Sequence, residues 1–188
     1  MLKRLICTCT AVACLGFTGA VASSQEVIHA MTGTIKSVDS THKTFTLLRD
    51  NHSQVTFKDM TDSNVRFTSD KKIFSDATAA HVFDEKGAYV IVFYYGLNPT
   101  AVAVEALGQG PFTSTVGTVA SVDDKDQMIS VKDKSGAIQR YKIGADTVAE
   151  GEMGVVEGLK LHTEKGDHIR VVGSASSNEP TALFVNEM

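Results

Sequence analysis

Few side chains in this sequence have the type and spacing that metal binding or catalysis requires. His29 and Met31 lie two positions apart in a segment of high strand propensity, which predicts that they share one face of a strand. An imidazole and a thioether on one face are ligands that a soft ion such as Cu(I) accepts. Copper binding at His29 and Met31 is therefore one hypothesis. The ordinary alternative is that the two side chains fill surface and core.

The other candidate groups favour solvated turns. The acidic residues at positions 123–126 do not continue into a twelve-residue calcium loop with its central glycine and terminal glutamate. The sequence contains no Gly-x-Ser-x-Gly elbow, phosphate-binding glycine loop or His-Glu-x-x-His motif. We therefore predict no enzymatic activity. Carboxylate pairs for glycoside hydrolysis leave no sequence signature, so a hydrolase stays open as an alternative.

An aromatic segment at residues 89–95 is the most distinctive candidate surface. Strand periodicity places its alternate side chains on one face. Those side chains are Tyr89, Ile91, Phe93 and Tyr95. Three interpretations stay open: burial against another part of the chain or another subunit, a locally thicker core, and a surface whose rings bind a protein or glycan partner. The net charge of −4 argues against a nucleic-acid partner, because such partners need a basic face.

The N-terminus has the pattern of an export signal. Lys3 and Arg4 precede a mostly apolar run, and residues 20–22 (Ala-Val-Ala) predict cleavage after Ala22. The run is too short to span a bilayer, and no later stretch is long and apolar enough to do so. A minor alternative is a lipoprotein modified at Cys14. All three cysteines lie in the signal, so the mature chain of 166 residues (188 minus 22) has no disulfide and no cysteine-based metal site.

The framework that must position these groups occurs twice. Residues 33–39, Gly-Thr-Ile-Lys-Ser-Val-Asp, return as residues 117–123, Gly-Thr-Val-Ala-Ser-Val-Asp, 84 positions later (117 minus 33). Five of the seven residues are identical, which indicates two copies of one small folding unit. Within the glycine-containing strand, Gly33 predicts a bulge or a close approach of the neighbouring backbone.

The repeat also shows which strand faces belong to a shared core. Val90 and Val92 align with apolar positions of the second copy, Ile169 and Val171, which predicts that this face packs inside each unit. The opposite face differs between the copies. The aromatic face of the first copy is replaced in the second by His168, Arg170, Val172 and Ser174. We therefore look for function where the two copies differ.

Each copy predicts about five strands and one short helical turn. Alternating residues at 44–57 indicate a β-hairpin, and a serine followed by an alanine-rich run predicts a short helix at 75–82. This set of elements favours a small closed or partly closed barrel of the OB type, with an antiparallel sandwich as the alternative. The fold class is thus mainly all-β, with two OB-like five-stranded β-barrels in tandem.

The motif Gly-Thr-[Ile/Val]-x-Ser-Val-Asp, a hairpin, and a Lys-Gly turn before an apolar strand together resemble exported bacterial barrel domains of unknown function. The resemblance covers nearly the whole chain after the signal, and it implies the fold and an extracytoplasmic location. Its motifs are structural and imply no catalytic residue. The first copy departs from the pattern, because Ala88 stands where the second has Asp167.

We therefore expect a signal peptide at residues 1–22, a first β-barrel unit at 26–107, a linker at 108–112 and a second unit at 113–188. The expected function is an exported, non-catalytic binding or adaptor module, periplasmic or secreted and without a cofactor. Its aromatic face around Tyr89, Ile91, Phe93 and Tyr95 would bind an envelope protein or glycan. The alternatives are a periplasmic copper carrier using His29 and Met31, and a hydrolase.

Overall fold

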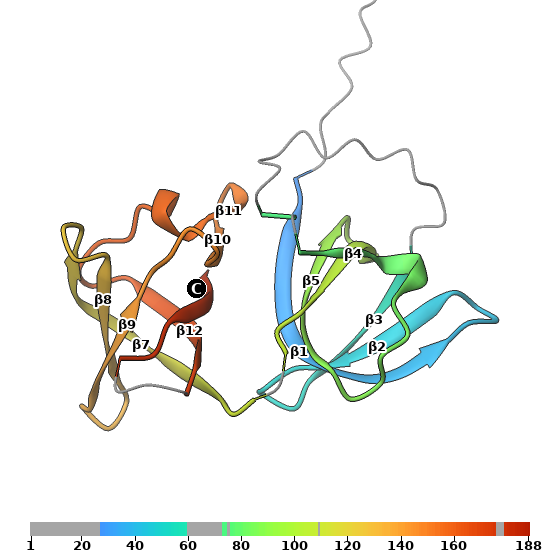
Figure 1. Cartoon of the computed structure of the whole chain (residues 1–188), viewed down its shortest axis with the longest axis horizontal. Helices are drawn as coiled ribbons and strands as arrows, with labels where there is room; N and C mark the ends of the chain where they lie inside the picture. The colour runs from blue at the N-terminus through green and yellow to red at the C-terminus, as the bar shows by residue number, and fades with distance from the viewer. Residues whose placement is uncertain (1–26, 60–72, 75, 109, 176–178) are drawn as a thin grey trace, which may run out of the picture.

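The structure is a computed structural model that describes residues 27–59, 73–74, 76–108, 110–175 and 179–188. The predicted signal peptide and its cleavage site lie outside the described residues. Within these ranges, no helix is long and apolar enough to cross a membrane. The described chain is almost entirely β-structure and forms two sheets that lie side by side, and the chain passes from the first to the second between Ala106 and Phe112 (Figure 1).

The first sheet has six strands in the order β3-β2-β1-β5-β6-β4. Their bounds are β1 His29–Asp39, β2 Thr44–Leu48, β3 Gln54–Asp59, β4 Thr78–Ala79, β5 Tyr89–Tyr95 and β6 Thr100–Ala106. β3 also pairs in parallel with β6, where Lys58 lies opposite Thr100. The pairings of five strands therefore run β1-β2-β3-β6-β5 and return to β1.

The second sheet has seven strands in the order β11-β10-β13-β12-β7-β8-β9. Their bounds are β7 Phe112–Asp123, β8 Met128–Asp133, β9 Ile138–Lys142, β10 Val148–Gly151, β11 Gly154–Glu157, β12 His168–Ser174 and β13 Ala182–Glu187. Lys142 and Thr181 form a parallel bridge between the end of β9 and the start of β13. This bridge is the counterpart of the β3–β6 pairing in the first sheet.

The sheets contain more strands than the five predicted for each unit. The first gains β4, and the second gains β10 and β11. The predicted helix at 75–82 is shorter than expected: Thr78 and Ala79 pair with β6, and only Ala80–Val82 forms a 3-10 helix, η1. Among the described residues no side chain caps η1, and the predicted cap, Ser75, lies outside them. The second unit has a matching 3-10 helix, η2, at Gly158–Lys160.

The duplicated motif adopts the same backbone in both sheets. The register of β1 against β2 shifts between Ile35 and Ser37, and that of β7 against β8 shifts between Val119 and Ser121. These bulges stand at equivalent positions of the repeat and bend both long strands in the same place. The motif thus has the same local geometry in both sheets, and two copies of one folding unit stay a prediction.

The two motif glycines are required by the close approach of the neighbouring strand. A Cβ atom at Gly33 would lie 2.5 Å from the carbonyl oxygen of Leu48, and one at Gly117 would lie 2.1 Å from that of Lys132. No real Cβ contact is so short, so a larger residue would push the two strands apart.

The motif aspartates close equivalent turns. Asp39 Oδ1 accepts hydrogen bonds from the backbone N–H groups of Thr41 and His42, at 3.0 Å each. Asp123 Oδ1 accepts the corresponding bonds from Lys125 and Asp126, at 3.1 Å each. The acidic stretch 123–126 is thus a turn held by its first aspartate, as the sequence favoured.

Three apolar clusters organise the interior. One lies within the first unit and contains Val90 and Val92, and a second lies within the second unit and contains Ile169 and Val171. The predicted shared core face is therefore confirmed. The third cluster draws residues from both units, including Phe93 of the first and Phe184 of the second. The two units are consequently joined by a buried apolar interface as well as by the linker.

Candidate binding pocket

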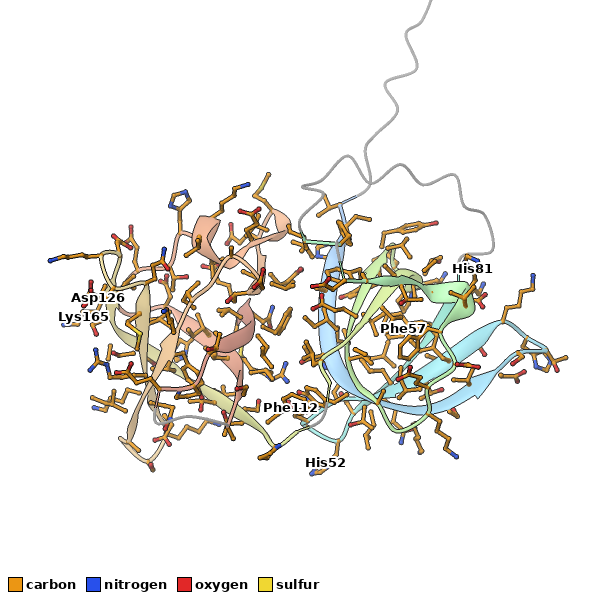
Figure 2. The ribbon with its side chains drawn as sticks, viewed as in Figure 1. His52, Phe57, His81, Phe112, Asp126 and Lys165 are labelled. Carbon is orange, nitrogen blue, oxygen red and sulfur yellow. The ribbon has the colours of Figure 1, made fainter. Side chains whose placement is uncertain are left out.

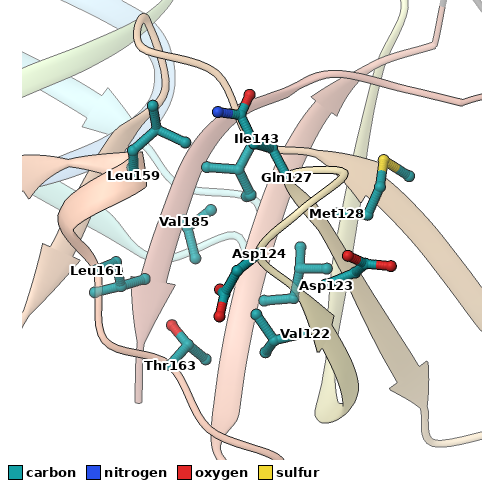
Figure 3. Close-up of a pocket in the computed structure, with 12 residues that line it drawn as sticks. Val122, Asp123, Asp124, Gln127, Met128, Ile143, Leu159, Leu161, Thr163 and Val185 are labelled. Atoms are coloured by element: carbon teal, nitrogen blue, oxygen red, sulfur yellow. The ribbon is translucent and has the colours of Figure 1, made fainter.

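The second unit has an open pocket between the turn that joins β7 to β8 and the segment that contains η2 (Figure 3). Its volume is about 330 Å³. Most of its lining is apolar. The apolar side chains include Val122, Met128, Ile129, Ile143, Leu161 and Val185.

The pocket combines a buried floor with an exposed apolar rim. Ile129 and Val185 belong to the core of the second unit and are 3% and 0% exposed. Val122 and Leu159, at the rim, are 41% and 45% exposed. An apolar group that enters the pocket would cover these exposed side chains and remove their apolar surface from water.

The wall that carries Leu159 is fixed by close packing against Thr147. The Gly158 N–H donates to the Thr147 carbonyl at 2.6 Å, and a Cβ at Gly158 would lie 2.6 Å from the Thr147 side chain. The Thr147 hydroxyl in turn donates to the Ala182 carbonyl at 2.7 Å and accepts from the Gly144 N–H at 2.9 Å. Hydrogen bonds through Thr147 therefore connect this wall of the pocket to Gly144 and to β13.

Two aspartates give the pocket mouth a negative charge. Asp123 is held by its turn, and its carboxylate and that of Asp124 point in different directions (Figure 3). Asp124 is exposed and, among the described residues, its carboxylate has neither a hydrogen-bond nor an ion-pair partner. It can therefore pair with a cationic group on a ligand without first breaking another contact.

The first unit has a pocket of about 370 Å³ at the equivalent place, between the turn after β1 and η1. The frame is the same, but the lining differs. Asp59 stands where the second unit has Ile143, and His81 of η1 stands where η2 has Leu159. The two units therefore have pockets at equivalent places with chemically different linings. The comparison of the two sequence copies did not single out these positions.

The aromatic face predicted from the sequence lies at the interface between the units. Tyr89, Ile91, Phe93 and Tyr95 all contact the apolar cluster that the two units share. Ile91 and Phe93 are 0% exposed, and Phe93 packs edge-on against Phe74 at a centroid distance of 4.7 Å. Of the three open interpretations, burial against the other unit describes this geometry. Ile91 and Phe93 present no surface to a partner in this structure.

His29 and Met31, the two residues of the copper hypothesis, both contact other side chains in the structure. His29 Nδ1 lies 2.6 Å from Glu150 Oε1 of the second unit, and the His29 ring tilts against Tyr94. Met31 is half-buried and packs against the core of the first unit. In the part of the chain that the structure describes, no three His, Cys, Asp or Glu side chains are grouped to hold a metal ion.

Polar contacts from both units border the apolar interface. Glu150 Oε2 accepts a hydrogen bond from the Ala30 N–H at 2.8 Å, so this carboxylate binds β1 through both oxygens. Burial raises the pKa of Glu150, and its bonds to His29 and Ala30 act in the opposite direction. A second contact joins the Arg170 guanidinium, the Asp50 carboxylate and the Tyr89 hydroxyl, which donates to Asp50 Oδ2 at 2.9 Å.

Glu105 of β6 has a strongly shifted ionisation. Its pKa is raised to about 7, mainly by burial and in addition by the nearby carboxylates of Asp76 and Asp146. A folded-state pKa above the ordinary value means that the folded protein holds this proton more tightly than the unfolded chain does. Glu105 therefore lowers the free energy of unfolding as the pH rises from about 4.5 to about 7, and its effect is constant above that range.

We predict that Glu105→Gln removes this part of the pH dependence. At pH 8.5 the free energy of unfolding of the variant is expected to exceed that of the wild type by about 1–2 kcal/mol. This is less than the free energy that corresponds to the full pKa shift, because the side chain is partly exposed. At pH 4.5 the two proteins should differ little. Urea denaturation at both pH values measures the difference. An equal difference at both would contradict the shifted ionisation of Glu105.

Sequence reasoning missed the pocket because its lining comes from several separate segments. One signal was available: aligning the two turns after the duplicated motif shows Asp124 and Gln127 opposite Ser40 and Lys43. Leu159 and Leu161 lie in a stretch without strand periodicity, so nothing placed them beside that turn.

No known protein family matches the sequence, and no curated protein matches it either.

Proposed function

We propose that the protein is an exported, non-catalytic binding module whose second-unit pocket receives an apolar side chain of a partner protein. The observation that carries this proposal is the exposed apolar rim of Val122 and Leu159 above a buried apolar floor. Each apolar side chain that covers such a surface contributes about 1.5–3 kcal/mol to binding, which makes a small pocket an effective anchor.

The lining chemistry favours a protein partner over a glycan. Sugars are usually bound against the flat face of an aromatic ring, and none of the described residues that line this pocket is aromatic. The Asp123 and Asp124 carboxylates favour a basic residue next to the entering side chain. We infer a partner segment in which a leucine, isoleucine, valine or methionine stands beside a lysine or arginine.

We also infer that five strands in each unit close into a small OB-like barrel. In the first unit the pairings return from β5 to β1, and in the second the bridge between Lys142 and Thr181 supplies the corresponding link. The backbone N–H groups of Lys58 and Lys142 donate to Pro99 and Pro180 at 3.1 and 3.0 Å. These equivalent contacts support the same strand circuit in both units.

Selection of short random peptides against the purified protein tests the proposal. We expect the enriched peptides to place an aliphatic side chain beside a basic one. Leu159→Asp should weaken the binding of these peptides at least tenfold, because it places a charge at the apolar rim. Ile138→Asp is the matched control, since Ile138 is also exposed, at 59%, but lies outside the pocket. Equal binding to both variants would contradict a role for the pocket.

A further inference from the structure

The rim of the second-unit pocket itself carries an aliphatic side chain next to a basic one. Leu159 and Lys160 are consecutive residues of η2, and their exposed fractions are 45% for Leu159 and 56% for the Lys160 side chain. An aliphatic residue beside a lysine is the pair that we inferred for the segment that enters the pocket. The surface around the pocket therefore holds both the hollow and a pair of side chains of the kind that fits it.

A carboxylate that Lys160 could bind lies on the opposite side of the same pocket. Leu159 lies on the η2 side of the hollow, and Asp124 lies on the side of the turn after β7 (Figure 3). Lys160 Nζ is already 3.5 Å from Glu157 Oε2, but an ammonium group has three N–H donors and can bind a second carboxylate. With opposite charges on the two sides of an apolar hollow, this surface is complementary to a copy of itself related by a two-fold axis.

The first unit lacks both members of this charge pair. Val82 of η1 stands where η2 has Lys160, and Ser40 stands where the second unit has Asp124. The first unit nevertheless forms a pocket at the equivalent place. The frame of the pocket therefore forms without either charge, and the fold does not account for the presence of Lys160 and Asp124.

We propose that the partner of this pocket is a second copy of the chain, which forms a symmetric dimer through the rim. This inference rests on the proposed function and identifies its partner segment as residues 159–160. Leu159 of one copy covers the pocket of the other against Val122, and Lys160 pairs with Asp124 of the second copy. Two-fold symmetry makes each of these contacts occur twice, so a small patch supplies a complete interface.

The dimer is expected to be weak, because stable interfaces bury about 1,200–2,000 Å² in total and this one is built around a single small pocket. We expect a dissociation constant on the order of 0.1 mM. Peptides with an aliphatic residue beside a basic one should compete with the dimer, because they occupy the same pocket.

Sedimentation equilibrium of the purified protein from about 10 µM to about 1 mM tests the proposal. Leu159→Asp should abolish the dimer. Lys160→Glu and Asp124→Lys should each weaken it by at least about tenfold, because each substitution turns both charge contacts into repulsions. Lys134→Glu is the matched control, since Lys134 is exposed and lies outside the pocket, and it should leave the dimer unchanged.

Mixing the two charge variants gives the sharpest result. A mixed dimer of Lys160→Glu with Asp124→Lys pairs the native lysine with the native aspartate and the introduced glutamate with the introduced lysine. The equimolar mixture should therefore dimerise nearly as well as the wild type, although neither variant does so alone. Such a recovery requires both variants to be folded, so it excludes unfolding as the cause of the single losses.

The outcomes separate this inference from the proposed function. A protein that stays monomeric throughout while its pocket binds the selected peptides would overturn the dimer and leave the proposed function in place, as would a different protein bound at Leu159. Absence of both the dimer and peptide binding would overturn both. A dimer that Leu159→Asp leaves intact, or a mixture of charge variants that stays monomeric, would also overturn the inference.

Discussion

Phe93→Ala is expected to lower the free energy of unfolding by about 3–5 kcal/mol, the range measured for removal of a buried aromatic ring. Phe93 has no exposed area, and its cluster contains Val148, Val172 and Phe184 of the second unit. The substitution would leave a cavity at the interface, so both units should lose stability together. Urea denaturation followed by far-UV circular dichroism measures the change.

Leu97→Ala is the matched control, because Leu97 is fully exposed in the turn between β5 and β6. A change of less than about 0.5 kcal/mol is expected there. If Phe93→Ala left the stability unchanged, the aromatic face of β5 would instead be free, and the partner-binding interpretation of Tyr89, Ile91, Phe93 and Tyr95 would gain support over burial between the units.

Gly117→Ala is expected to lower the free energy of unfolding by about 2–4 kcal/mol, because the added Cβ would lie 2.1 Å from the Lys132 carbonyl oxygen. That oxygen belongs to the backbone of β8, so relief requires β7 and β8 to separate and their hydrogen bonds to lengthen. Thermal unfolding followed by calorimetry measures the loss, and Gly33→Ala should behave in the same way in the first unit.

Gly144→Ala provides the comparison within the same unit. The nearest atom to a Cβ there lies 3.8 Å away, and the backbone is not in the left-handed region. This variant should retain nearly the full stability of the wild type. A similar loss in Gly117→Ala and Gly144→Ala would mean that the motif glycine is not the point of close strand contact.

The parts of the fold that the sequence predicted are those set by local pattern. The duplicated motif carries its own turn aspartate and its own glycine, so both copies could be placed before any tertiary contact was known. Alternation along β5 correctly separated Val90 and Val92 from the aromatic face. In each case the information lies within a few neighbouring residues.

The parts that the sequence did not predict depend on contacts between distant segments. β4 has only two residues and exists because Thr78 and Ala79 meet β6, while β10 contains a buried glutamate, Glu150, whose partners His29 and Ala30 are about 120 residues away. The pockets were missed for the same reason. Asp59 ends β3 and Ile143 directly follows β9, and no local pattern in the sequence shows that each lies near a 3-10 helix.

The most direct test of the central claim is photo-crosslinking, in intact cells that produce the protein, from the rim of the second-unit pocket. Benzoylphenylalanine replaces Leu159 in one protein and Ile138 in another, and crosslinked species are identified by mass spectrometry. We predict a defined protein partner that is crosslinked from Leu159 only, through a segment in which an aliphatic residue neighbours a lysine or arginine. The same species from both positions, or no crosslink from Leu159, would contradict it.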